Sequence, residues 1–430
     1  MIDRSLAEWL DWAGRQHPVG IDMGLDRVSA VAERLGFEAP ERRPAPRTII
    51  VAGTNGKGST TIFAEALLRA SGYRVGSTIS PHIHTFNERV RVDGNPVGDD
   101  ALASAFAAVE AARGDITLTY FEYSALVALW IFRAAAVDAA VLEVGLGGRL
   151  DAMNLVSADV AVVTSIGLDH EAFLGSDLEG IGREKAGVFR SGGTAVIGSD
   201  VTRSVHEEAR RLGCRTRVMG RDFQVEITRE GWAFRGSELA LGDLPWGHLA
   251  PYNCALAIEA VSALTSLSPM VVRSALRSAT FPGRCEAWQL ADTRVIVDVA
   301  HNPAGAAFLR DTLRHRFPGV RFVAILGMLS DKDASGVPSA FEESGIAGWI
   351  VTSTRGPRGQ SAAQIAQQLA LADVNVAENP VDALEAALAV VRSGGADAVL
   401  GFGSFSVVED LRNQLLTLGA AASNVHAGQR

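Results

Sequence analysis

A glycine-rich turn between an apolar run and a helical pattern carries the clearest chemical signal in this 430-residue chain. The apolar run 48–52 predicts a buried strand, and the apolar spacing after residue 59 predicts a helix. Between them stand Gly53, Thr54, Asn55, Gly56, Lys57, Gly58 and Ser59, here called the phosphate loop. In such a turn, backbone N–H groups and the positive helix end attract phosphate, a lysine reaches the terminal phosphates, and a hydroxyl ligates magnesium. The turn therefore predicts a nucleoside-triphosphate site.

The spacing of the phosphate loop departs from the strict P-loop pattern. Gly53 lies only three residues before Gly56, and Gly58 separates Lys57 from Ser59. A glycine turn that caps an ordinary helix is therefore the alternative interpretation.

Two further runs of buried-strand type, 138–144 and 159–166, also end in polar residues. Because ligands gather beyond the carboxyl ends of parallel strands, Glu143 and His170 are expected near the nucleotide phosphates. Magnesium prefers oxygen ligands, so Ser59, Ser80 and Glu143 are the candidate ligands. The alternatives are a carboxylate that faces water for Glu143 and a solvated or hydrogen-bonded side chain for His170.

Two other charged positions admit more than one role. Lys185, beside Glu184 on a predicted helix, could bind a ligand or simply form solvated helix pairs. His301 follows the predicted strand 295–299, where it could enter a ligand site or merely begin the next helix.

Composition restricts the class of protein and its partners. The net charge of −9 and a pI near 5.6 leave no global basic field, so we expect neither nucleic acid nor a membrane as partner. Cys214, Cys254 and Cys285 are far apart, as in reduced core residues of a cytoplasmic protein. The charged N-terminus does not resemble a signal peptide, and the apolar stretch 125–142 is interrupted by charges before it reaches spanning length.

The pattern of elements predicts two α/β domains with a boundary near 282–286. The first domain opens with two helices, near 6–13 and 24–35, and a proline-rich linker, 39–46. Strands are expected at 73–76, 88–94, 295–299, 321–326, 349–352 and 398–401, with a helix at 178–189, a β-rich section at 224–235, a helix from about 253 and a disordered tail at 420–430.

Ten strings, in order along nearly the whole chain, resemble one known family. They are GTNGKGST, SPH, LTYFEYSALVALW, LEVGLGGRLDAMN, VVTSIGLDH, GREKAGVFR, PGR, DVAHNP, GMLSDKD and GSF. Together they resemble the dihydrofolate synthase/folylpolyglutamate synthases, which belong to the Mur-type ATP-dependent amide ligases. The resemblance implies an α/β fold: residues 1–284 as a P-loop, Mur-ligase-type ATP-binding domain with a parallel-rich sheet and a pterin site, and 285–430 as a Rossmann-like domain that contributes to an ATP/glutamate cleft.

The resemblance also implies roles for particular residues. Lys57, His170 and a carbamoylated Lys185 would be catalytic; one magnesium would lie near Ser59, Ser80 and Glu143, and a second would be bound by Glu143, His170 and Lys185. ATP would contact the phosphate loop together with Asn253, Arg284, Asp298 and His301. The pterin would contact Asp22, Met23, Gly24, Leu25, Thr119, Tyr120, Phe121, Glu122, Leu150, Asp151 and Ala152. A monovalent cation would be a further cofactor.

The implied activity is ATP-dependent ligation of L-glutamate to dihydropteroate and to reduced folates, by a monomer, through an acyl phosphate. Three alternatives stay open: a folylpolyglutamate synthase alone, a Mur-type ligase acting on a cell-wall nucleotide, and a nucleotide-dependent switch. Two positions depart from the family pattern: Met153 stands where threonine is common, and Ser406 where histidine is common. The first leaves the shape of the pterin pocket open.

Overall fold

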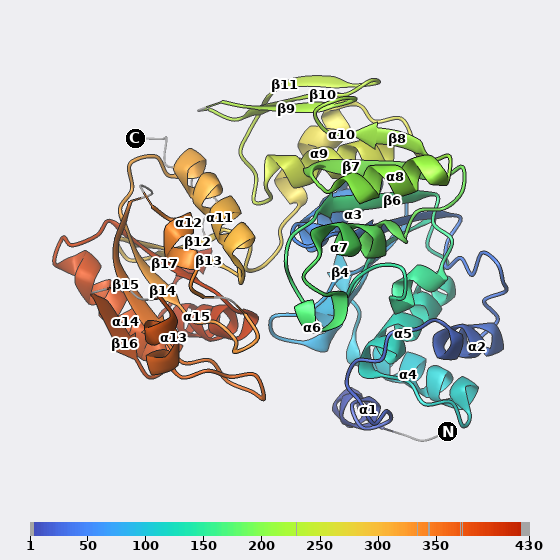
Figure 1. Ribbon diagram of the computed structural model, residues 1–430, viewed down its shortest axis with the longest axis horizontal. Coiled ribbons are helices and arrows are strands. Elements are labelled where there is room, and N and C mark those ends of the chain that lie inside the picture. Colours follow the sequence, from blue (N-terminus) through green and yellow to red (C-terminus); the bar gives the residue numbers. More distant parts are fainter. Residues whose placement is uncertain are drawn as a thin grey trace. The chain divides into compact units, whose positions relative to one another are not determined.

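The computed structural model describes residues 4–228, 230–332, 334–342, 345–369, 371 and 373–422, which form two compact units. Unit 1 comprises Met1–Gly247 and Pro251–Ala279, and unit 2 comprises His248–Ala250 and Thr280–Arg430. Figure 1 labels the elements of both units.

Unit 1 is built on an eight-stranded sheet of order β4-β3-β2-β5-β1-β6-β7-β8. The six strands from β2 to β8 run parallel, and β3 and β4 continue the sheet as antiparallel edge strands. The strands are β1 (Arg47–Ala52), β2 (Val75–Thr78), β3 (Val90–Val92), β4 (Asn95–Pro96), β5 (Ala139–Glu143), β6 (Val160–Ser165), β7 (Thr194–Asp200) and β8 (Arg215–Val218). Every residue of β2 and β5 is buried, as expected for parallel strands covered on both faces.

Helices cover both faces of this sheet. They are α1 (Leu6–Ala13), α2 (Asp26–Arg34), α3 (Lys57–Ala70), α4 (Asp99–Arg113), α5 (Tyr120–Ala134), α6 (Glu171–Leu174), α7 (Leu178–Ala186), α8 (Arg203–Arg211), α9 (Pro251–Ser262) and α10 (Pro269–Ser278), with short 3₁₀ helices η1 (Phe86–Arg89) and η2 (Ala152–Leu155). Helix α3 packs on β1, β2 and β5 and against α9 and α10, whereas α1, α2, α4 and α5 form a separate group (Figure 1). Gly76 of β2 lies under the Phe132 ring of α5, because an added Cβ would be 2.5 Å from it.

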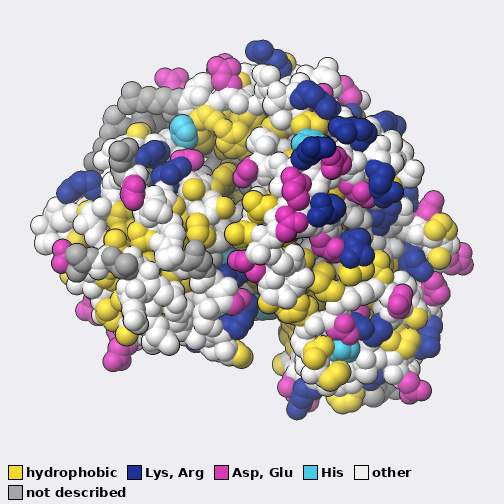
Figure 2. Space-filling view, in the orientation of Figure 1, with side chains coloured by type: hydrophobic (Ala, Val, Ile, Leu, Met, Phe, Trp, Pro, Cys, Tyr) yellow, Lys and Arg dark blue, Asp and Glu magenta, His cyan; other side chains and the backbone are white. Residues whose placement is uncertain are grey.

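A small antiparallel sheet, β11-β10-β9, also belongs to unit 1. Its strands are β9 (Gln224–Ile227), β10 (Trp232–Arg235) and β11 (Ala240–Leu244). Trp232 and Phe234 of β10 are buried. On the visible face of unit 1, basic and acidic side chains lie near one another (Figure 2). On helix α8, Arg203 pairs with Glu207 and Arg211 pairs with Glu208.

Unit 2 contains a seven-stranded sheet of order β16-β15-β14-β17-β13-β12-β18. The five strands from β16 to β13 are parallel. Strand β12 pairs antiparallel with β13, and β18 pairs antiparallel with β12. The elements are β12 (Glu286–Leu290), β13 (Thr293–Asp298), α11 (Pro303–Arg316), β14 (Phe322–Leu326), α12 (Val337–Ala340), β15 (Ile346–Thr352), α13 (Ala362–Leu369), β16 (Val374–Ala377), α14 (Pro380–Arg392), β17 (Ala398–Phe402), α15 (Phe405–Thr417) and β18 (Ala421–Ala422). Alternation of strand and helix thus produces a second α/β fold.

The α/β class and the parallel-rich sheets confirm the predicted fold, and several local predictions need correction. The predicted strand 88–94 is a 3₁₀ turn followed by the short strand β3, because Thr85 and Glu88 form a capping box that starts the turn. The predicted strand 73–76 begins later, at Val75, and β12 was not predicted. Cys214 is only half-buried, unlike the other two cysteines.

Two further sequence predictions concern the apolar stretch 125–142 and the disordered tail. The stretch 125–142 is a core helix followed by a strand, as predicted. Within the described residues, no helix combines the length and apolarity needed to cross a membrane. The tail predicted as disordered at 420–430 needs correction, because Ala421–Ala422 form strand β18 and pair with β12. Residues 423–430 lie outside the described part of the chain, as does Asp333 in the GMLSDKD string.

Candidate functional site

The phosphate loop connects β1 to α3 and is fastened to the end of β6. The Thr54 amide donates to the Ser165 carbonyl (2.8 Å), and the Gly167 amide donates to the Thr54 hydroxyl (2.9 Å). Thr164 Oγ1 donates to the Asn55 carbonyl (2.6 Å), and the Asn55 amide donates to Ser165 Oγ (3.1 Å). These bonds hold the loop backbone in one conformation.

Two glycines of the loop are required by conformation and by space. Gly56 precedes α3 with φ of +88°, and a Cβ there would lie 2.4 Å from Asn253 Oδ1. Gly53, with φ of +145°, would place a Cβ 1.9 Å from Thr164 Oγ1. Positive φ and these contacts both exclude other residues, and they bring the predicted nucleotide residue Asn253 against the loop.

Two lysines converge on the backbone of the loop. Lys57 Nζ donates to the carbonyls of Gly53 (3.1 Å) and Thr54 (3.2 Å), and Lys185 Nζ donates to the same Gly53 carbonyl (3.0 Å). Lys185 is only 5% exposed, which excludes the alternative of a solvated helix pair. Burial, followed by the charge of Lys57, lowers the pKa of Lys185 to about 7. Two lysine amines beside a helix N-terminus are suited to a polyanion.

The glycine run after β5 positions Lys185. A Cβ on Gly148 would lie 2.7 Å from the Glu184 carbonyl and 2.8 Å from the Lys185 carbonyl, so the run passes directly over α7. Glu184 accepts from Arg149 Nε (2.9 Å) and from the Leu150 amide (3.3 Å). Glu184 therefore serves the glycine run and does not form the predicted solvated pair with Lys185.

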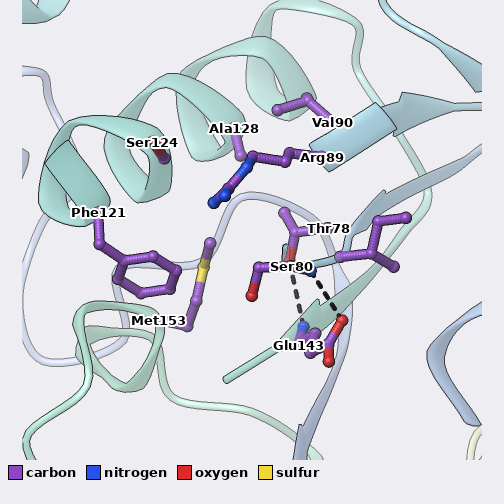
Figure 3. Close-up of a pocket in the computed structure, with 10 residues that line it drawn as sticks. Thr78, Ser80, Arg89, Val90, Phe121, Ser124, Ala128, Glu143 and Met153 are labelled. Carbon is purple, nitrogen blue, oxygen red and sulfur yellow. Dashed lines mark hydrogen bonds between the residues drawn. The ribbon is translucent and has the colours of Figure 1, made fainter. Parts of the chain in front are cut away.

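Glu143 and Ser80 meet at a small pocket. Glu143, at the end of β5, is only 4% exposed, which excludes the alternative of a carboxylate that faces water. Its Oε2 accepts from the Ser80 amide (2.9 Å), and its own amide donates to Thr78 Oγ1 (3.1 Å), as Figure 3 shows. The carboxylate and the Ser80 hydroxyl are hard oxygen donors of the kind that Mg²⁺ prefers.

His170 lies after β6, at the start of α6. It has φ of +54°, a left-handed conformation that is uncommon for a residue other than glycine. Its Nε2 lies 3.8 Å from Asp169 Oδ2. Within the described residues, no three His, Cys, Asp or Glu side chains form a group able to hold a metal alone. The donors present instead suit a magnesium that is held largely by phosphate oxygens.

Several predicted pterin residues accept hydrogen bonds from backbone amides through their side chains. Thr119 and Glu122 form a capping box at the start of α5: the Thr119 amide donates to Glu122 Oε2 (2.7 Å), and the Glu122 amide donates to Thr119 Oγ1 (3.2 Å). Glu122 Oε1 lies 3.2 Å from Arg27, which also pairs with Asp22 (2.7 Å). Arg27 thus links the segment before α2 to the start of α5.

Asp151 has a similar local role. Its Oδ2 accepts from the amides of Gly145 (3.0 Å) and Leu146 (2.9 Å), and its Oδ1 accepts from the Met153 amide (2.9 Å). Burial raises the pKa of Asp151 to about 6, against the effect of these hydrogen bonds. Asp151 therefore shapes the loop after β5.

The other pterin candidates gather around that loop. A Cβ on Gly145 would lie 2.4 Å from the Phe121 ring, and one on Gly147 would lie 3.1 Å from Met23 Cε. Leu150 belongs to the loop itself and Ala152 begins η2, which follows it. Tyr120 adjoins Phe121 on α5, and Gly24 and Leu25 precede α2. The structure thus brings three segments that are distant in sequence to the carboxyl end of β5.

Unit 2 contains three of the predicted ATP-binding residues, and they lie together at the end of β13. Asp298 accepts from the amides of Cys285 and Ala300 (both 2.7 Å), and burial raises its pKa. The Arg284 guanidinium lies 5.4 Å from the centre of the Phe405 ring, and the His301 ring lies 6.2 Å from it. Asn302, not His301, caps α11. Ser406 contacts Ser404 at the start of α15, 3.2 Å between hydroxyls.

Comparison with known proteins finds a family match in each unit. Residues 51–241 match the Mur ligase middle domain, and residues 283–405 match the Mur ligase, glutamate ligase domain. The dihydrofolate synthase/folylpolyglutamate synthase of Escherichia coli strain K12 is 42% identical over 405 residues, 94% of each chain. The protein of that name from Haemophilus influenzae is 37% identical, over 94% of this chain and 96% of its own.

This chain belongs to the dihydrofolate synthase/folylpolyglutamate synthase family. The structure of E. coli FolC in complex with DHPP and ADP agrees, with a TM-score of 0.88 and 40% identity over 96% of this chain and 98% of that one. The chain is thus a Mur-type ATP-dependent ligase with the α/β fold of that family.

Some residues that shape the site of this family member were not predicted. Thr164 and Ser165 lie inside a strand pattern, which gives no sign that their hydroxyls hold the phosphate loop. Arg89 lines the pocket at Glu143, yet in the sequence it is one of several arginines beside a short strand. Only the folded chain identifies it.

Proposed function

We propose that this ligase joins L-glutamate to dihydropteroate, forming dihydrofolate, and to reduced folates, forming polyglutamates. The observation that carries the proposal is full-length similarity, across both units, to relatives named for both activities. ATP and a divalent metal are its cofactors, in line with the ADP, AMPPNP and manganese in related structures.

The reaction has two steps. An oxygen of the substrate carboxylate attacks the terminal phosphorus of ATP; an acyl phosphate forms and ADP leaves. The glutamate amine then attacks the acyl carbon, so that an amide bond forms, inorganic phosphate leaves and the amine loses a proton. Positioning and electrostatic stabilisation supply most of the catalysis in phosphoryl transfer.

Lys57 and the loop amides would bind the terminal phosphates, with Lys57 also catalytic. Ser59, Ser80 and Glu143 would hold one magnesium; Glu143, His170 and Lys185 would hold a second. When bound, the metals would neutralise charge on the transferring phosphoryl group. The rest of ATP would contact Asn253, Arg284, Asp298 and His301.

Lys185 is proposed to carry a carbamate. Its neutral amine would attack carbon dioxide, forming an N–C bond and releasing one proton, which converts a cation into a carboxylate-like ligand. A pKa of about 7 supports this, because an ordinary lysine at neutral pH is almost wholly protonated. Lys185→Ala should be inactive and partly restored by a short carboxylic acid; electron density for an unmodified amine beside bound ATP and two metals would exclude the carbamate.

The pterin would lie against the edge formed by residues 22–25, 119–122 and 150–152, with Phe121 offering a stacking face. For Thr119, Glu122 and Asp151 the role would be to shape the pocket, since their polar atoms serve the backbone. The proposal also includes the division at 284/285 with an ATP/glutamate cleft, a monovalent cation, a monomeric state, a cytoplasmic location, and no nucleic acid or membrane partner.

The decisive experiment measures ADP release by the purified chain with ATP, magnesium and glutamate. We expect glutamate-dependent release with dihydropteroate and also with tetrahydrofolate. Release with tetrahydrofolate alone would identify a folylpolyglutamate synthase. Release only with a cell-wall nucleotide, or release that is independent of glutamate and pteroate, would replace the proposal by the other ligase or by a nucleotide switch.

A further inference from the structure

A half-buried arginine faces the small pocket between the proposed pterin and magnesium residues. Arg89, at the end of η1, lines this pocket together with Ser80, Phe121, Glu143 and Met153. Figure 3 shows its guanidinium end pointing into the space that Phe121, Met153 and Ser80 surround. The pocket therefore presents a fixed cation between an apolar wall and a carboxylate.

The guanidinium is held from one side only. Its Nε donates to His82 Nδ1 (2.7 Å), and its carbon lies 5.7 Å from the centre of the Tyr120 ring and 5.9 Å from that of Phe86. Burial lowers the pKa of His82 to about 4, so that ring is neutral and its Nδ1 can accept. In the described chain, neither terminal amino group of Arg89 donates a hydrogen bond to a protein atom. Both are therefore available to a ligand.

The size of the pocket restricts what can enter. Its free volume is about 10 Å³, roughly that of one water molecule. That space admits one oxygen of an oxyanion. The two terminal amino groups of a guanidinium match the two oxygens of a carboxylate in one plane.

We propose that Arg89 binds the carboxylate of the pteroate or folate substrate and presents it for phosphorylation. The inference rests on the proposed function, in which that carboxylate is the nucleophile. Phe121 is one of the proposed pterin residues and Met153 follows another, Ala152, whereas Ser80 and Glu143 are proposed magnesium ligands. The proposed substrate has its pterin against Phe121 and Met153 and its reacting end at Glu143. Its carboxylate must then lie at Arg89.

The test compares dihydropteroate with its carboxamide, which has the same body but no charge. Binding of each is measured by calorimetry to the full chain with magnesium and a non-hydrolysable ATP analogue. Wild type should prefer the acid. Arg89→Met should lower affinity for the acid by about 10- to 100-fold, as expected for a charge-assisted pair, and leave the carboxamide unchanged. Arg89→Lys, which keeps the charge without the planar fork, should lose less.

Arg91→Lys is the matched control, because Arg91 lies two residues away and pairs instead with Glu65 (3.1 Å). It should leave the preference for the acid intact. Equal loss of acid and carboxamide, or a loss confined to the ATP analogue, would overturn the proposal and make Arg89 a structural partner of Glu143. A wild type that does not discriminate between acid and carboxamide would overturn it too.

The same variants separate this inference from the proposed function. A wild-type chain that releases no ADP with any pteroate or folate would refute the ligase assignment itself. A wild-type chain that does so, while Arg89→Met retains its preference for the acid, refutes only the role of Arg89. Thermal unfolding followed by circular dichroism verifies that each variant is folded.

Discussion

The phosphate loop and the pocket at Glu143 lie at the same sheet yet are built in opposite ways. The loop is one contiguous segment, and the bonds from β6 only fix its shape. The residues that line the pocket are not contiguous in the sequence. They come from β2, η1, β3, α5, β5 and η2. The comparison teaches that the proposed nucleotide site is encoded by adjacent residues, whereas the proposed substrate pocket depends on how distant segments pack.

Lys57→Ala should produce the largest effect on the loop side of this comparison. Loss of a cation that meets the transferring phosphoryl group should lower kcat by about 10³-fold, with little change in affinity for dihydropteroate. Steady-state ADP release measures this. Arg69→Ala, which removes an exposed cation at the other end of α3, is the control and should retain activity. Near-normal turnover by folded Lys57→Ala would contradict the assignment.

Glu143→Gln tests the pocket side. An amide keeps the shape but supplies no charge to a metal, so activity should fall by about 100-fold and the magnesium requirement should rise. Titration of activity with magnesium measures both. Glu226→Gln, on the exposed surface of β9, should behave as wild type. If added magnesium leaves Glu143→Gln and wild type indistinguishable, Glu143 is structural.

Gly148→Ala should act on stability and thereby link the two regions. A methyl group 2.7–2.9 Å from the backbone of Glu184 and Lys185 must displace α7, at a cost of about 1–3 kcal/mol in the free energy of unfolding. Urea unfolding measures the cost. Gly242→Ala is the control, because no atom lies within 4 Å of its added Cβ. Equal stability of both variants would show that α7 adapts freely.

Lys185→Met should reveal how much the buried, unmodified amine of Lys185 lowers the free energy of unfolding. The pKa of Lys185 falls from 10.5 in the unfolded chain to about 7 in the fold, so between these values the unfolded state binds more protons. Wild-type stability should then rise with pH in this window relative to Lys185→Met, by at most about 1.4 kcal/mol per pH unit. The unfolding free energy without carbon dioxide measures this; a difference that does not vary with pH would mean an ordinary pKa. Arg183→Met, on the same helix but exposed, should show no such trend.

Met153→Leu should produce the smallest effect. Met153 is buried in the pocket wall, and a volume-conserving substitution there costs less than about 1.5 kcal/mol. We expect the KM values for dihydropteroate and tetrahydrofolate to change by less than about tenfold and the KM for ATP not at all. A large change in the KM for ATP would mean that the pocket and the loop are not separate regions.

The proposed nucleotide residues lie in local patterns that the sequence shows, whereas the pocket at Glu143 does not. The phosphate loop follows β1 and Glu143 ends β5, which is where open α/β sheets gather ligands, and Lys185 lies on helix α7. The strand predicted at 88–94 is confined to Val90–Val92, because a local capping box turns residues 86–89 into a 3₁₀ helix. Strand β12 was missed because its alternation is short and follows a turn.

What the sequence by itself determined is the family, the α/β class and the phosphate loop, because each depends on residues adjacent in the chain. What only the tertiary structure decided is which polar groups remain available once the backbone has been satisfied. Glu122 and Asp151 are occupied by backbone amides, whereas Arg89 keeps its terminal amino groups for the pocket. The physical reason is that buried polar atoms must find partners, and those partners come from segments whose proximity no local pattern encodes.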